Sequence, residues 1–551
     1  MIYKIVYFLF FTAIFSSCSQ ESLQAKWNNS QNEPKDSINN KPQFEEEPIV
    51  YTPIDEANYP YEIPYEDSIV KVEINTAKST PFSNKQLALN CTFQTNTGMS
   101  KGYDSAPSQA FVRWYKPVIL RFPPGAWANF YDWKGDNRNR HGDDYNNGDF
   151  TSQCDNNPNY KYGINGLNSL QKTMGFDILW IWNLNYFDEN YAVEQLQDYT
   201  SRGFKVSDIE LGNELFYRTQ RATLTSTPAK IVSRAKIFAN ALTAEKSGLR
   251  FALPIAWKNG GADDYNKVIM QDQSYFDALV MHLYYGNESQ NDDPGEGGTS
   301  GPVVMDKKSI KRMFTARNKF KYEAERIHKK YNTDKPFWLT EWGVTCGRNA
   351  ASFLAMADTY LYFFDNPDLY EYVVWFQTHG LNPFFETGGT IGKPLYTLTG
   401  YGAVYDLLED VFRDSYLLET KITSAQFDGD KDLIQETSKN FDIMNIDMDD
   451  YKVNAVNCKA VKDKEGTYSL FFVNKRNRPI TVDLRVDGKE SSVNGDYCYI
   501  NFKSLSDNPE WVEKKQGSLE FGDQTKIGSI KDGKIVLRSL SITKITNVKF
   551  D

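Results

Sequence analysis

Histidine and closely paired cysteines are scarce in this chain. It has four histidines in 551 residues, and none of its six cysteines forms a Cys-X-X-Cys pair. Zinc centres are built mostly from histidine and cysteine ligands, and dithiol redox sites use the Cys-X-X-Cys spacing. The sequence therefore predicts neither a zinc centre nor a redox motif, and we expect no cofactor. Whether the acidic loop DWKGDNRNRHGDDYNNGDF binds calcium stays open, although its spacing does not match an EF-hand and favours a solvated loop.

Positive charge is also sparse and dispersed. Lysine and arginine number 62 against 72 aspartates and glutamates, which gives a net charge of −10 and a pI of about 5.3. No block of lysine or arginine interrupts this acidic background. Nucleic-acid-binding domains need a basic face to neutralise phosphates, so the composition argues against a nucleic-acid partner.

The N terminus lacks an apolar run long enough to span a bilayer. The stretch from Ile5 to Phe15 is too short for that purpose, follows Lys4, and ends in two serines and Cys18. This order is typical of a bacterial lipoprotein signal, in which residues 1–17 are removed and Cys18 carries the lipid. An ordinary secretory signal that is cut nearby is the alternative.

We therefore expect an exported protein, held at the outer membrane or cell surface as a lipoprotein, with the periplasm as the alternative. Residues 18–50 are rich in Asn, Gln, Ser, Glu and Pro, which predicts a flexible tether. If Cys18 carries lipid, five cysteines remain, so at least one thiol is unpaired in a monomer. Cys458 and Cys498 lie in one β-rich region and either pair or stay reduced.

Apolar runs alternate with amphipathic segments over residues 85–412. This pattern indicates βα units around a parallel sheet. The helical patterns include residues 192–201, 228–246, 309–330 and 351–364. The candidate strands are residues 87–93, 117–122, 176–184, 208–214, 251–257, 277–285, 336–343 and 372–378. Eight such units predict an α/β fold of the (β/α)8 TIM-barrel type, with an open α/β sheet as the alternative.

The pattern of predicted secondary structure changes after the barrel. Residues 413–551 carry turns between short alternating strands such as YSLFFVN and ITVDLRV, which predicts an accessory all-β sandwich domain. Residues 51–84 form a lead-in to the barrel, and their segment IVKVEINTA has the same strand pattern. We therefore expect the sandwich to be built from both ends of the chain.

Polar residues close many of the apolar runs, and in a (β/α)8 barrel the reacting groups come from the C-terminal ends of the strands. Two of them are carboxylates, Glu214 at the end of the fourth strand and Glu341 at the end of the seventh. A closed barrel would bring these distant residues together. The other candidates are Asn90, Arg121, Asn213, His282, Tyr284 and Trp375.

A facing pair of carboxylates suits the hydrolysis of a glycosidic bond. One carboxyl group protonates the leaving oxygen and the other acts as nucleophile or base, and mutual repulsion keeps one of them protonated. Gly212 would let the backbone leave the pleat, so that Asn213 and Glu214 both reach the substrate.

The remaining candidates fit roles around this pair. Asn213 would bind a sugar hydroxyl, and Arg121 would orient the nucleophile and hold its pKa down. Tyr284 or His282 would donate a hydrogen bond to the nucleophile. Trp375 would form a flat floor for the sugar ring. Asn90, at the end of the first strand, has the weakest case.

The order of these motifs resembles the clan A glycoside hydrolases. The resemblance rests on ILRFPPGAWANFYDW with Arg121, ELGNE with Glu214, HLYY with His282, WLTEWG with Glu341, and VVWF with Trp375. It implies that Glu214 is the acid/base, that Glu341 is the nucleophile and that the reaction retains anomeric configuration.

Within the clan, the heparanase and β-glucuronidase group and the α-L-arabinofuranosidase group look most similar to this chain. RFPPG stands where RFPGG is expected, so the choice between the two groups stays open.

The sequence thus predicts a retaining glycoside hydrolase acting on a plant, algal or host polysaccharide or oligosaccharide. Two alternatives use the same barrel: a catalytically silent glycan-binding lipoprotein, and a transglycosylase. Several candidates also have a structural interpretation. Glu214 alone could cap a helix, and Glu341 alone could be a surface residue before a turn. Trp375 and His282 alone could be core residues, and Arg121 could be a structural ion-pair partner. The sugar, its linkage and exo or endo action are not specified by these motifs.

Overall fold

The computed structural model covers the barrel and the β domain with interruptions. The signal segment, Cys18 and nearly all of the tether lie outside the described residues, as do three further cysteines, so export and lipidation remain predictions. The described residues are 49, 51–62, 68–90, 102–105, 108–109, 112–113, 116–138, 161–257, 262–285, 306–344, 347–376, 384–386, 397–436, 443–508 and 525–550. None of the helices in these ranges is long and apolar enough to cross a membrane.

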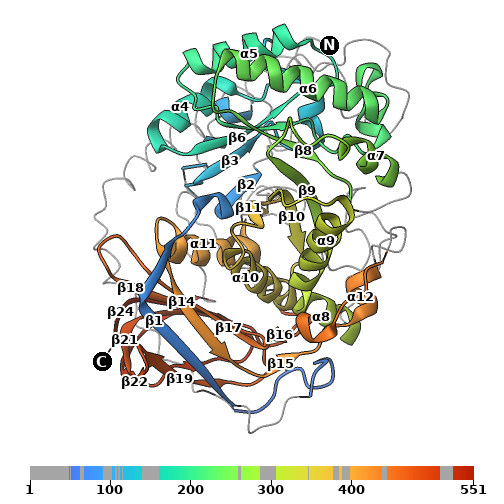
Figure 1. The fold of residues 1–551 in the computed structure, drawn as a ribbon. Helices are drawn as coiled ribbons and strands as arrows, with labels where there is room; N and C mark the ends of the chain where they lie inside the picture. Colours follow the sequence, from blue (N-terminus) through green and yellow to red (C-terminus); the bar gives the residue numbers. More distant parts are fainter. Residues whose placement is uncertain are drawn as a thin grey trace, which may run out of the picture.

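Eight parallel strands close into a barrel, which confirms the predicted (β/α)8 fold (Figure 1). Each predicted strand overlaps one observed strand, and neighbours around the barrel follow chain order. The last strand pairs with the first through Val374 opposite Ala88. The strands are β2 (Ala88–Asn90), β3 (Ile119–Phe122), β6 (Asp177–Trp182), β7 (Asp208–Leu211), β8 (Arg250–Pro254), β9 (Ala278–Tyr285), β10 (Phe337–Val344) and β11 (Tyr370–Trp375).

Helices surround the barrel, and polar caps set where several of them begin. The side chains of Asp188, Thr227 and Asn349 accept backbone hydrogen bonds at the starts of three helices. The segment 309–330, predicted as one helix, is two, because Thr315 leaves helical geometry and its hydroxyl donates to the Lys311 carbonyl. The helices are α4 (Ile164–Met174), α5 (Glu189–Ser201), α6 (Pro228–Glu245), α7 (Ala262–Ile269), α8 (Lys307–Phe314), α9 (Ala316–Tyr331), α10 (Ala350–Phe364) and α11 (Gly400–Phe412).

Alternation along the strands decides which side chains enter the barrel. One core cluster holds the inward residues, among them Ala88, Ile119, Val280 and Val374. The intervening residues, such as Val373, belong to the larger cluster between the barrel and its helices. Successive side chains of a strand point to opposite faces of the sheet. The position of a candidate residue along its strand therefore decides whether its side chain points into the barrel or outward toward the helices.

The second domain is a curled ten-stranded sheet that matches the predicted sandwich-like β domain. Strand β1 (Ile69–Pro81) runs antiparallel to β14 (Tyr416–Thr423) and parallel to β19 (Ile480–Val486), so both ends of the chain build it, as predicted. The other strands are β17 (Val456–Lys462), β18 (Tyr468–Asn474), β20 (Lys489–Glu490), β21 (Val493–Asn501), β22 (Thr525–Gly533), β23 (Val536–Leu537) and β24 (Ser541–Phe550).

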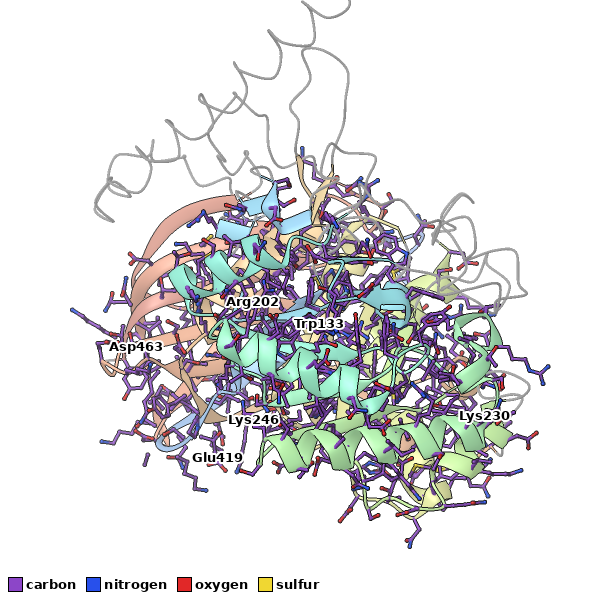
Figure 2. The ribbon with its side chains drawn as sticks, turned by 90° about the horizontal axis from the view of Figure 1, so that it is seen from above. Trp133, Arg202, Lys230, Lys246, Glu419 and Asp463 are labelled. Carbon is purple, nitrogen blue, oxygen red and sulfur yellow. The ribbon has the colours of Figure 1, made fainter. Side chains whose placement is uncertain are left out.

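The two faces of this sheet have different partners. Leu470 and Phe472 of β18 belong to a cluster formed within the curled sheet, whereas Phe471 and Val473 join the core that covers the barrel helices. Helices α10 and α11 lie between the barrel and the sheet (Figure 1). Lys230, on α6, and Glu419 and Asp463, in the sheet domain, lie at opposite ends of the molecule (Figure 2).

Cys458 and Cys498 do not form the disulfide that the sequence left open. Neither sulfur is part of a disulfide, and the two residues lie on β17 and β21, which are separated in the sheet by β18 and β24. Strands lie about 4.8 Å apart, so two intervening strands put the sulfur atoms far beyond bonding distance. Burial raises the pKa of the Cys458 thiol, which keeps it protonated and unreactive.

Candidate active site

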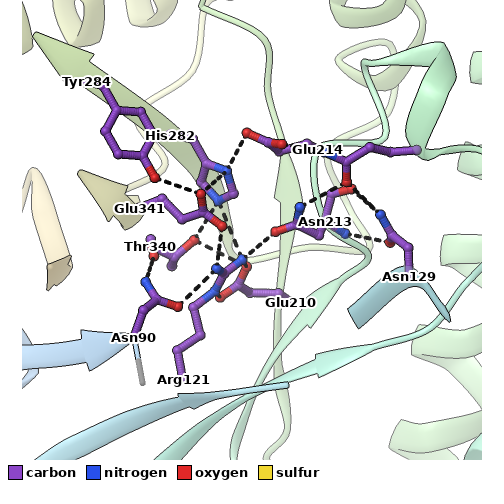
Figure 3. A network of polar contacts seen from close by, with 11 residues as sticks. Asn90, Arg121, Asn129, Glu210, Asn213, Glu214, His282, Tyr284, Thr340 and Glu341 are labelled. Carbon is purple, nitrogen blue, oxygen red and sulfur yellow. Dashed lines mark hydrogen bonds and ion pairs between the residues drawn. The ribbon is translucent and has the colours of Figure 1, made fainter. Parts of the chain in front are cut away.

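Seven of the eight candidate residues meet in one network at the C-terminal end of the barrel (Figure 3). They come from four strands and from the turn after β7. Trp375 is the exception. The seven are Asn90, Arg121, Asn213, Glu214, His282, Tyr284 and Glu341.

Gly212 turns the chain out of β7. Its φ is +80°, and a Cβ there would lie 2.5 Å from the Leu215 side chain, so glycine is required. Glu214 also has a positive φ, +42°. Asn129 fixes the turn from both sides, because its Oδ1 accepts from the Asn213 amide at 2.9 Å and its Nδ2 donates to the Asn213 carbonyl at 2.6 Å. Asn213 and Glu214 can therefore both face the network.

Glu341 is held by two donors. Arg121 Nη1 donates to Oε1 at 2.8 Å, and the Tyr284 hydroxyl donates to Oε2 at 2.8 Å. Pairing of β10 with β9 shifts in register between Trp338 and Glu341, so the strand is irregular just before this side chain. Burial raises the pKa of Glu341, while the Arg121 guanidinium acts to lower it.

Glu214 is the more accessible of the two carboxylates. Its side chain is 18% exposed, against 6% for Glu341. Its Oε1 lies 2.9 Å from His282 Nδ1, and its Oε2 accepts from Gln220 Nε2. His282 Nδ1 is also 3.6 Å from Glu341 Oε2, and the ligating atoms of these three residues lie within 4.8 Å of one another. The structure thus brings together the two carboxylates that 127 residues (341 − 214) separate in the sequence.

Glu210 is a site residue that the sequence analysis missed. Its carboxylate accepts from Arg121 Nε at 2.7 Å and from Nη2 at 2.8 Å, and both side chains are fully buried. Burial alone would lower the pKa of Arg121, but the Glu210 and Glu341 carboxylates raise it above its ordinary value. A carboxylate flanked by Ile209 and Leu211 inside an apolar strand was the available signal.

Gln220 is the second residue that was missed. It belongs to the short 3-10 helix Arg218–Gln220. Its Oε1 accepts from Asn129 Nδ2 at 2.9 Å and from Asn213 Nδ2 at 3.0 Å, while its Nε2 donates to Glu214. Gln220 therefore ties Glu214 to the turn that presents it. No periodic pattern in the sequence marks such a loop residue.

His282 is neutral at ordinary pH. Burial lowers the pKa of His282 to about 4, with Arg121 acting in the same direction and the Glu341 and Glu210 carboxylates opposing it. Its Nε2 lies 3.0 Å from Thr340 Oγ1. The ring thus links Glu214 to β10.

The prediction that Trp375 forms a sugar platform is wrong. The ring is completely buried and packs against Trp342 and Tyr401, with centroids at 4.8 and 5.2 Å. Like Val373 two residues earlier on β11, Trp375 points outward from the barrel, toward the helices. The next residue, Phe376, is half-buried beside the site, 5.8 Å from the Tyr284 ring centroid and near Glu341 across Gly125. Phe376, and not Trp375, is therefore the partly exposed aromatic side chain beside the site.

Among the described residues, Glu214, His282 and Glu341 form the one group whose geometry could hold a metal ion. Arg121 and Tyr284 already donate to both oxygens of Glu341. A cation bound by Glu341 would have to displace a donor or lie beside a guanidinium. The donor set therefore suits a carboxylate pair better than a metal.

No known protein-family profile matches this chain, and no curated protein matches it in sequence. Its fold matches solved glycoside hydrolases. The arabinofuranosidase of glycoside hydrolase family 51 (GH51) from Xanthomonas axonopodis pv. citri superposes with a TM-score of 0.62 at 14% identity, covering 87% of this chain and 99% of that one.

Two further structures extend this comparison. The α-L-arabinofuranosidase from Thermotoga maritima, in complex with arabinose, has a TM-score of 0.62 at 12% identity and covers 87% of this chain and 100% of that one. A GH44 xyloglucanase from Paenibacillus polymyxa has a TM-score of 0.55 at 11% identity and covers 88% and 100%. At these identities the comparison establishes the shared fold, a barrel with a β domain.

Proposed function

We propose that the protein is a retaining glycoside hydrolase in which Glu214 is the acid/base and Glu341 is the nucleophile. The short separation of their carboxylates carries the proposal, because their closest oxygens lie within 4.8 Å. Retaining enzymes hold their two carboxyl groups about 5–5.5 Å apart, whereas inverting enzymes need about 6.5–9.5 Å to admit a water molecule. The gap in this site suits direct attack by one carboxylate.

In the first step, Glu341 attacks the anomeric carbon while Glu214 gives its proton to the glycosidic oxygen. The bond to the leaving alcohol breaks and a glycosyl ester forms on Glu341. Arg121 and Tyr284 hold the two oxygens of Glu341 and so aim one lone pair at the sugar. Glu214, nearer to solvent, is placed to meet the leaving group.

In the second step, Glu214 acts as a base. It takes a proton from water, the resulting hydroxide attacks the anomeric carbon, and the ester bond to Glu341 breaks. Glu341 is again a carboxylate and Glu214 is again an acid, so the cycle closes with no external reactant except water. Two displacements at one carbon retain its configuration.

The substrate class is a polysaccharide or oligosaccharide of plant, algal or host origin. The matched structures include arabinofuranosidases and a xyloglucanase, so arabinofuranosides and xyloglucan are the first substrates to test. Uronate-containing glycans complete the set, because the sequence also resembles the β-glucuronidase group.

The test is release of reducing ends from this panel by the native chain and by Glu341→Gln. We expect release by the native chain and a loss of at least about 1000-fold in the variant, since Gln cannot form the ester. Glu465→Gln, a surface change in a turn of the β domain, serves as the matched control and should keep full activity. Sugar binding without release by the native chain would instead identify a glycan-binding protein.

A further inference from the structure

The contacts of His282 determine where one proton of the site resides. His282 Nδ1 lies 2.9 Å from Glu214 Oε1, and Nε2 lies 3.0 Å from Thr340 Oγ1. Thr340 Oγ1 is in turn 3.2 Å from Glu210 Oε2. A neutral imidazole carries a single N–H, so one ring nitrogen donates and the other accepts.

Glu210 fixes the direction of this chain of hydrogen bonds. It accepts from Arg121 through both oxygens, at 2.7 and 2.8 Å, as an ionised carboxylate does. An ionised carboxylate has no proton to give, so the contact between Thr340 and Glu210 requires the threonine hydroxyl as donor. Thr340 Oγ1 then has only lone pairs to offer His282.

Nε2 of His282 therefore carries the imidazole proton and donates it to Thr340. Arg121 Nη2 lies 3.4 Å from Nε2, but its two protons already serve Glu210 and Asn213, both at 2.8 Å. Nδ1 is left with a lone pair. At 2.9 Å from Glu214 Oε1, that lone pair accepts a hydrogen bond only if Glu214 is protonated.

We infer that Glu210 and Thr340 are positioning residues that hold His282 as its Nε2–H tautomer, so that Glu214 rests in its acid form. Glu341 has the complementary surroundings, because Arg121 and Tyr284 both donate to it. The two carboxylates are thus distinguished before any sugar binds. This inference rests on the proposed function for its catalytic meaning, but the tautomer itself does not.

The tautomer can be measured in the resting protein by 15N nuclear magnetic resonance of the histidine-labelled chain. The four histidines give few signals, and His282→Gln identifies the one of interest. We expect Nε2–H in the native chain. In Thr340→Val, which removes the hydroxyl and keeps the side-chain shape, we expect Nδ1–H to gain population. An Nδ1–H tautomer in the native chain, or an unchanged tautomer in Thr340→Val, would overturn the inference whether or not the protein cleaves glycans.

Kinetics test the consequence on the aryl glycosides of whichever sugar the panel identifies. Thr340→Val should lose about tenfold in kcat/KM on glycosides with poor leaving groups, which need the acid, and less than about threefold on dinitrophenyl glycosides, which do not. The basic limb of its pH profile should move to lower pH, and Thr340→Ser should restore it. Equal losses on both substrates, or an unmoved basic limb, would show that Thr340 has only a structural role.

Discussion

Three carboxylates and one arginine set the charge of the site at the level of single residues. Glu210 and Glu341 both bind Arg121, whereas Glu214 binds neutral partners, His282 and Gln220. With Glu210 and Glu341 ionised, the arginine compensates one of the two negative charges. A third ionised carboxylate so close to the other two would be repelled by both, which agrees with the protonated Glu214 inferred from the His282 tautomer.

His282 should also make stability depend on pH. Its pKa is about 4 in the folded chain against an ordinary 6.5, so between these values the unfolded chain binds a proton that the folded chain does not. The stability from neutral His282 is complete above pH 6.5 and is lost as pH falls toward 4. Asparagine at this position cannot titrate. Between pH 6.5 and pH 4 the free energy of unfolding of His282→Asn should therefore fall by about 2 kcal/mol less than that of the native chain.

Urea unfolding of both chains between pH 7 and pH 4 measures this difference. The pH 7 values supply the constant offset that the substitution itself causes. Parallel stability curves for the native chain and His282→Asn would contradict the prediction.

The sequence specified some of these residues and not others for clear reasons. Arg121 and Glu341 close or interrupt apolar runs at strand ends, where the fold gathers its polar groups. Glu210 lies within a strand, and its partner Arg121 is 89 residues away, so no local pattern joins them. Gln220 depends on the path of a loop, which single-sequence patterns do not specify.

At the level of elements, the strands were predictable because each is a short apolar run between helical patterns. Whether each strand residue faces the inside or the outside of the barrel was harder to predict from the sequence. Strand β11 is almost completely buried on both faces, so it lacks the alternation of polar and apolar residues that would reveal its inward side. That is why Trp375 was placed at the site and Phe376 was not.

Because Trp375 and Phe376 point to opposite sides of the barrel sheet, substitutions at these two neighbouring positions should have opposite effects. Trp375→Ala should cost about 3–5 kcal/mol in the free energy of unfolding, because it empties a packed site between β11 and the helices. Phe376→Ala should leave stability nearly unchanged and should weaken substrate binding by about 1 kcal/mol, or about fivefold in KM. Thermal unfolding and KM on the best panel substrate separate the two effects. A stable Trp375→Ala with a raised KM would restore the platform role to the tryptophan.

At the level of the whole molecule, a buried ion pair joins the barrel to the β domain. Lys475, just after β18, donates to Asp358 of α10 at 2.7 Å and to the Phe314 carbonyl at 3.1 Å. The Lys475 side chain is fully buried, and that of Asp358 is 3% exposed. Asn457 of β17 donates to the same carboxylate. The β domain is thus fixed to the layer of helices that supports β10 and β11.

Lys475→Met should destabilise the molecule by about 3–5 kcal/mol, because it leaves Asp358 buried without its cation. The double change Lys475→Met with Asp358→Leu removes both charges and should regain most of that loss. Urea unfolding of the two single variants and the double variant gives the coupling between the residues. A double variant no more stable than Lys475→Met would argue against a penalty from the unpaired carboxylate.

Covalent trapping tests the pairing of Glu214 and Glu341 most directly. An activated 2-fluoro glycoside of the cleaved sugar should inactivate the native chain, and peptide mapping should find the added mass on Glu341. Formation of that ester followed by slow release of a product with retained configuration is the predicted result. A label on a different carboxylate, or a product of inverted configuration, would contradict the assignment of the two residues.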